Sequence, residues 1–113
     1  MNIQIDVEEV ENKYILRIQG RIDTMTTPIL EKRIEELVKQ NHWDLLADFT
    51  DVEYLSSAGL RVLLSSTKKA RAHQGHFVLF SIDEDVLEII KMAGFERVLT
   101  ICTSEKDALQ SCA

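Results

Sequence analysis

Short apolar runs and amphipathic stretches alternate along this chain, and that alternation restricts its fold more than any single motif does. At the start, apolar residues at Ile3, Ile5 and Val7 alternate with polar ones, which predicts a half-buried strand. A second apolar run, 14–18, follows and is closed by Gly20. Because the connection is short, about six residues, the two strands are expected to pair antiparallel at one side of a sheet.

Helices and strands then alternate to the end of the chain. Thr26, Thr27 and Pro28 predict a helix start with a threonine cap and proline at the first helical position, and the helix should end near Gln40-Asn41. Each later helix is expected to begin at small polar or acidic residues, which cap a helix or suit the positive end of its dipole. These starts are Ser56-Ser57, Asp83-Glu84-Asp85 and Ser104-Glu105-Lys106-Asp107, and the helix stops are Gly75 and Gly94. The intervening strands are expected at 43–49, 76–82 and 98–101, with a turn at Thr50-Asp51 and an apolar helix face of Val86, Ile89, Ile90 and Ala93.

The resulting order of elements is strand, strand, helix, and then three strand–helix units. Strands that alternate with helices form parallel crossover units, so the pattern predicts an α/β fold. We expect a mostly parallel sheet of about four to five strands with an antiparallel N-terminal edge strand, packed with about four helices. A chain of 113 residues fits one domain, residues 1–113.

Composition excludes several classes of function. The net charge of −6 argues against nucleic-acid binding, which needs a basic surface, and suits a protein partner instead. No stretch approaches the roughly 20 apolar residues that span a bilayer, and the N-terminus lacks the pattern of a signal peptide, so we expect a cytoplasmic protein that does not enter a membrane. Cys102 and Cys112 lack metal-ligand spacing and are expected to be free thiols, with no metal or other cofactor. The histidines His42, His73 and His76 are expected at the surface.

The segment best suited to a binding or modification site is Ser56-Ser57-Ala58-Gly59, between a buried strand and a helix. Free backbone N–H groups and the positive dipole end make a helix N-terminus favourable for a phosphate, and the small residues let another molecule approach the backbone. From spacing alone, a simple N-cap role for a serine here is the stronger interpretation. A catalytic serine is disfavoured because the GxSxG elbow is absent, and a nucleotide-binding P-loop is excluded because GxxxxGK[ST] does not occur.

Residues 48–64, DFTDVEYLSSAGLRVLL, resemble the signature of STAS domains of the anti-sigma-factor-antagonist kind. Those proteins have a strand ending in an acidic residue, a few turn residues, and then Asp-Ser-x-Gly-Leu opening a helix. The segments Gly20-Arg21-Ile22-Asp23 and Met92-Ala93-Gly94-Phe95 also resemble family motifs, so the resemblance covers essentially the whole chain.

The resemblance implies a binding switch, not an enzyme. In this family the unphosphorylated protein binds an anti-sigma factor that is also a serine kinase, and a sigma factor is released. The kinase uses ATP to phosphorylate the serine two residues before the glycine, which breaks the complex, and a metal-dependent serine phosphatase restores the binding form. Matching Gly59-Leu60 assigns the phosphorylated serine to Ser57, and it implies that Asp23 and Asp48 lie near that serine at adjacent strand ends. The implied partner-binding set is Asp23, Ser56, Ser57, Ala58, Gly59 and Arg61, with Asp48 and Gly59 supporting the turn and the helix start; turn and cap chemistry is the alternative for the two aspartates.

The chain departs from the family pattern at two positions. Ser56 replaces the usual acid before the phosphorylated serine, which leaves Ser56 as an alternative acceptor. Arg61 replaces a residue that is small in many members, and it is either a partner contact or simply solvated. An alternative function is a constitutive STAS scaffold or binding subunit in a larger signalling or lipid-transport assembly.

Overall fold

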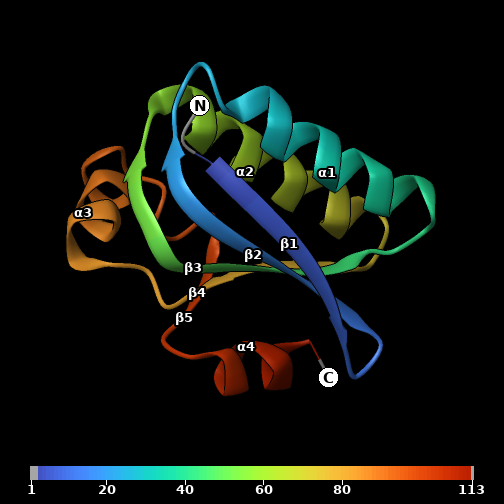
Figure 1. Ribbon diagram of the computed structural model, residues 1–113. Helices are drawn as coiled ribbons and strands as arrows, with labels where there is room; N and C mark the ends of the chain where they lie inside the picture. Colours follow the sequence, from blue (N-terminus) through green and yellow to red (C-terminus); the bar gives the residue numbers. More distant parts are fainter. Residues whose placement is uncertain (1–2, 113) are drawn as a thin grey trace.

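A single twisted sheet with helices on both faces makes up the computed structural model, which describes residues 3–112 (Figure 1). The five strands lie in the order β1-β2-β3-β4-β5; β1 and β2 pair antiparallel and the remaining neighbours pair parallel. The strands are β1 (Ile3–Val10), β2 (Lys13–Ile22), β3 (Asp44–Leu55), β4 (His76–Phe80) and β5 (Thr100–Cys102). The helices are α1 (Thr27–Lys39), α2 (Ser57–Ala72), α3 (Glu84–Met92) and α4 (Glu105–Ser111). The predicted α/β fold, with its antiparallel N-terminal edge strand and four helices, is confirmed.

The sheet is buried on both faces, as the near-continuous apolar runs of the central strands require. In β3, Leu45 and Ala47 join the larger core, which also includes buried residues of α1, α2 and α3. Leu46, between them, points to the opposite face and joins a smaller core with Ala108 of α4 and Cys112. Three helices therefore cover one face and α4 covers the other, below the sheet in Figure 1.

Two strands run further than the sequence predicts. β2 continues through Gly20 to Ile22, because Gly20 adopts φ 112° and accommodates an irregularity in the pairing with β3. β3 continues through the predicted turn at Thr50-Asp51 to Leu55, with bulges that keep it hydrogen-bonded to β2. These extensions bring the ends of β2 and β3 together, since Ile22 pairs with Leu55.

The other boundaries differ from expectation by a few residues. β4 ends at Phe80 and not at 82, and β5 occupies Thr100–Cys102 and not 98–101. α2 ends at Ala72, three residues before the predicted stop at Gly75. The left-handed residue that follows the helix is Gln74, with φ 61°, and not Gly75. Gly94, with φ 80°, does follow the end of α3 as predicted. Ala93, predicted on the apolar face of α3, is exposed because the helix ends one residue earlier.

The two cysteines both belong to the smaller core, and the histidines lie elsewhere on the molecule. Cys102 and Cys112 are free thiols, and burial raises the pKa of the Cys112 thiol. His73 is exposed, while His42 and His76 are only half-buried. Within residues 3–112 no helix is long and apolar enough to cross a membrane.

Candidate functional site

The start of α2 is fixed mainly by Ser56. Its backbone N–H donates to the Ile22 carbonyl at the end of β2 (2.8 Å), and its hydroxyl accepts from the Gly59 N–H (3.1 Å). With extended backbone angles (φ −84°, ψ 169°), Ser56 is the N-cap of the helix. The capping role that spacing predicts for a serine here thus falls on Ser56, whose hydroxyl is already used by the fold.

Ser57, the first residue of α2, is different in each of these respects. It is exposed, and no hydrogen bond within residues 3–112 involves its hydroxyl. Ala58, which follows, is half-buried. The segment therefore presents one uncommitted hydroxyl to solvent, directly after a serine whose hydroxyl is occupied.

Gly59 serves the packing of the helix start and not the approach of a partner. It is buried, and a Cβ at this position would lie 2.5 Å from Ile22 Cγ2 and 2.8 Å from Leu55 Cδ1. Only glycine lets α2 begin this close to β2 and β3. The expectation that a second molecule reaches the backbone at Gly59 is wrong, because Ile22 and Leu55 occupy that space.

Asp23 lies at the end of β2, next to this helix start, as predicted. Its carboxylate oxygen Oδ1 accepts from the N–H groups of Met25 (3.0 Å) and Thr26 (3.1 Å), which fixes the turn into α1. Thr26 occupies the N-cap position of α1 but its hydroxyl does not cap the helix, because it donates to the Arg21 carbonyl (2.7 Å) and accepts from the Asp23 N–H (2.9 Å). Helix α1 begins at Thr27, so Pro28 follows its first residue.

Asp48 does not belong to this site. It lies in the middle of β3, seven residues before Leu55, which corresponds to roughly 20 Å along a strand. The expectation that Asp48 supports the helix start next to the serine is therefore wrong. The reason is that β3 does not end near residue 49 but continues through two bulges to Leu55, so Asp48 lies in the middle of the strand and not at its end.

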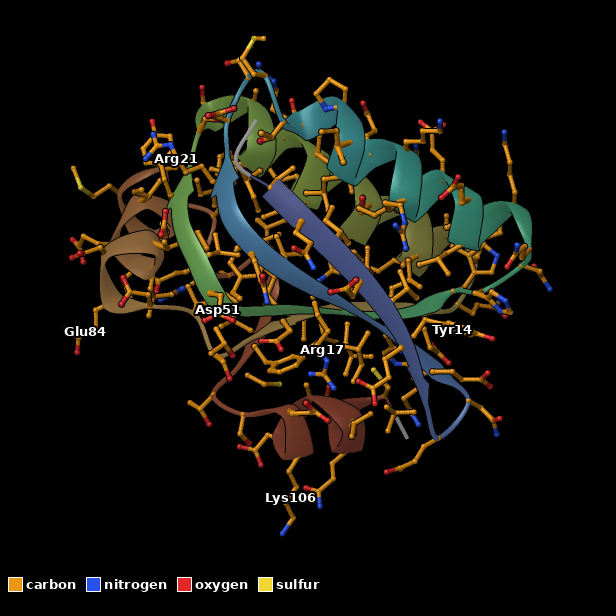
Figure 2. The ribbon with its side chains drawn as sticks, in the orientation of Figure 1. Tyr14, Arg17, Arg21, Asp51, Glu84 and Lys106 are labelled. Atoms are coloured by element: carbon orange, nitrogen blue, oxygen red, sulfur yellow. The ribbon has the colours of Figure 1, made fainter. Side chains whose placement is uncertain are left out.

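Asp48 is part of an ionic cluster that fastens α4 to the other face of the sheet. Arg17 of β2 contacts Glu8 (2.8 Å), Asp48 (3.0 Å) and Glu105 of α4 (2.6 Å). Figure 2 shows Arg17 between the sheet and α4. Burial by itself raises the pKa of the Asp48 carboxyl, but hydrogen bonds from Thr50 and Arg17 outweigh it and hold that pKa below its ordinary value. This cluster is structural, since it joins three strands and a helix.

The site also includes residues that the sequence did not single out. The Arg21 guanidinium lies over the Tyr54 ring, 4.4 Å from its centroid, and Nε of Arg21 is 3.8 Å from Asp23 Oδ2. Two large apolar side chains here face solvent: Tyr54, three residues before Ser57, is 37% exposed, and Met25, in the turn that follows β2, is 73% exposed. The only sequence signal for these two residues was their position after the apolar runs 14–18 and 43–49. The pairing of Arg21 with Tyr54 could not be predicted, because it depends on the bulges in β3.

Comparison with known proteins places this geometry in a family. The STAS domain matches residues 4–108, which is nearly the whole chain. The chain belongs to the STAS domain family. The anti-sigma-B factor antagonist of Bacillus subtilis is 28% identical over 97% of this chain and 100% of its own length.

Solved structures agree with that assignment. An anti-sigma factor antagonist from Mycobacterium paratuberculosis superimposes with a TM-score of 0.87 at 26% identity, covering 97% of this chain and 93% of the other. The Bacillus cell fate determinant SpoIIAA in its phosphorylated form has a TM-score of 0.72 at 14% identity, with 96% and 98% coverage, which shows a shared fold. The two relatives above 25% identity are thus both named as anti-sigma factor antagonists.

Proposed function

We propose that this protein is an anti-sigma-factor antagonist controlled by phosphorylation of Ser57. In its unphosphorylated form it binds an anti-sigma factor that is also a serine kinase, and a sigma factor is released. Transfer of the γ-phosphoryl group of ATP to the Ser57 hydroxyl, with release of ADP, ends that binding, and a metal-dependent serine phosphatase regenerates the binding form. The names of the relatives support the role of anti-sigma-factor antagonist, and these relatives match essentially the full length of the chain.

The observation that carries the assignment of the serine is the contrast between Ser56 and Ser57. The Ser56 hydroxyl accepts a hydrogen bond from Gly59, and its backbone N–H is bonded to Ile22. The Ser57 hydroxyl is exposed and makes no hydrogen bond within the described residues, so a kinase can reach it without breaking the helix start. This contrast favours Ser57 over its neighbour Ser56 as the residue that accepts the phosphate.

The proposed partner surface surrounds Ser57 and consists of exposed or half-exposed side chains from three segments. Asp23 and Met25 come from the turn after β2, Ala58 and Arg61 from the start of α2, and Tyr54 from the end of β3. A phosphate on Ser57 would add about −1.5 to −2 charges at this surface. Since a protein surface that binds the neutral serine is not arranged to accept that charge, the phosphate weakens the complex by repulsion and desolvation.

The test uses each serine-kinase anti-sigma factor encoded by the source organism, purified with ATP and Mg²⁺. We expect the cognate kinase to add one phosphate to the parent protein and to Ser56→Ala, and none to Ser57→Ala. In calorimetry, Ser57→Ala should bind that kinase as the unmodified parent does, and Ser57→Asp should bind at least tenfold more weakly. Equal binding by Ser57→Ala and Ser57→Asp would refute the switch and leave a constitutive scaffold as the function.

A further inference from the structure

Two arginines near the start of α2, Arg21 at the end of β2 and Arg61 on the helix, make no hydrogen bond to a carboxylate within residues 3–112. Arg61 follows Ser57 by four residues on α2, so the two side chains lie on the same helix face one turn apart. Arg61 is exposed, and no ion pair or hydrogen bond within residues 3–112 involves it. Its guanidinium is therefore free to bind an anion attached to Ser57.

Arg21 approaches from the neighbouring strand end. It pairs in register with Tyr54, three residues before Ser57, and Figure 2 shows it beside the upper end of β3, where the chain turns into α2. Its guanidinium stacks on the Tyr54 ring, which orients the planar group, and no hydrogen bond within residues 3–112 involves its N–H groups. The 3.8 Å separation from Asp23 is too long for a hydrogen bond.

The contrast with Arg17 shows how loosely Arg21 is held. Arg17 contacts three carboxylates at 2.6 to 3.0 Å and is committed to the fold. Arg21 and Arg61 are both at the surface, and their loss would cost the fold little. One such guanidinium group a helical turn from the exposed hydroxyl, and a second on the adjoining strand end, could each bind a phosphate through bidentate contacts.

We propose that Arg21 and Arg61 bind the phosphate of phosphorylated Ser57 within the same molecule. The inference rests on the proposed function, because it concerns the modified form of Ser57. The carboxylate that competes for Arg21 is Asp23, 3.8 Å away, and Arg61 has no carboxylate within ion-pair distance among residues 3–112. When the phosphate is present, both arginines are neutralised in place, so the partner loses the positive contact of Arg61 in addition to meeting new negative charge.

The test needs no kinase, because phosphoserine can be incorporated at position 57 during translation. The midpoint of the phosphate titration is then read by ³¹P NMR in the full chain. A unit charge about 6 Å away in water shifts such a midpoint by about half a pH unit. We expect Arg21→Gln and Arg61→Gln each to raise the midpoint by about 0.5, and the double variant by about 1.

The matched control is Lys68→Gln, which removes one positive charge from the same helix about 16 Å from Ser57. It should leave the midpoint unchanged, whereas Arg21→Lys and Arg61→Lys, which keep the charge, should move it less than the glutamine variants do. If Arg21→Gln and Arg61→Gln titrate like Lys68→Gln, the phosphate is not bound by these arginines and the proposal is overturned. Because the phosphoserine is built in, this result does not depend on whether a kinase modifies Ser57 in the host.

Discussion

Replacing Gly59 by alanine tests whether the start of α2 is packed as tightly as the structure shows. The added Cβ would lie 2.5 Å from Ile22 Cγ2 and 2.8 Å from Leu55 Cδ1, both from fully buried side chains, and 3.4 Å from the Ile22 carbonyl oxygen. Contacts this short force a shift of the helix or the strands, which costs about 1–3 kcal/mol in a packed core. Alanine returns up to about 1 kcal/mol through its better helix propensity. The net expectation is a loss of about 1–2 kcal/mol.

Urea denaturation followed by circular dichroism measures this loss, which corresponds to a midpoint lower by about 1 M. The matched control is a cycle with Ile22→Ala, which removes the atom closest to the new Cβ. In the Ile22→Ala background, Gly59→Ala should cost less than about 0.5 kcal/mol, since only the flexible end of Leu55 remains in the way. If Gly59→Ala leaves the parent as stable as before, or costs the same in both backgrounds, the close packing of α2 on the ends of β2 and β3 is refuted.

Three further expectations follow from the same contacts. Ser56→Ala should lower the unfolding free energy by about 1 kcal/mol through loss of the N-cap, and Ser57→Ala by less than about 0.5, as urea denaturation will measure; equal losses would contradict the assignment of the cap. Asp48, whose pKa is lowered in the fold by its hydrogen bonds in spite of burial, contributes stability that is present above its unfolded pKa of 3.8 and is lost as the pH falls through the lower folded value. Thermal melts from pH 6 down to pH 2 should therefore show a smaller acid loss in Asp48→Asn than in the parent, and parallel curves would contradict this. Cys112, which is buried and has a raised pKa, should react with a thiol reagent at least tenfold more slowly than half-buried Cys102 in the native protein, with equal rates in urea; equal native rates would show that α4 does not cover it.

The fold class was predictable because the signals that define it are local and repeated. Apolar runs such as 77–80 are typical of strands buried on both faces, and the starts of α2, α3 and α4 carry their own caps, as with Ser104, whose hydroxyl accepts from the Asp107 N–H. The antiparallel first pair followed from a short connection, which leaves no room for a crossover.

What the sequence could not predict depends on how distant segments pair. Thr50-Asp51 has the composition of a turn, yet β3 passes through it, because pairing with β2 satisfies its backbone through a bulge that no local signal marks. That extension moved Asp48 away from the serine and into the cluster around Arg17. It also determined that Tyr54 lies under Arg21, a contact between residues 33 positions apart in sequence.

The two serines illustrate the same limit at the site. Spacing identified a polar pair at a helix start but could not say which hydroxyl the fold uses, because the N-cap is defined by backbone angles and a bond to Gly59. The structure resolves the capping role in favour of Ser56.

Mapping the phosphate on the protein isolated from its own host tests the central claim most directly. Intact mass gives the number of phosphates, and fragmentation of the peptide that contains Ser56 and Ser57 gives the position. We predict two populations, one unmodified and one with a single phosphate on Ser57, with their ratio changing with growth conditions. Phosphate on Ser56, or a protein that is unmodified under all conditions, would contradict it.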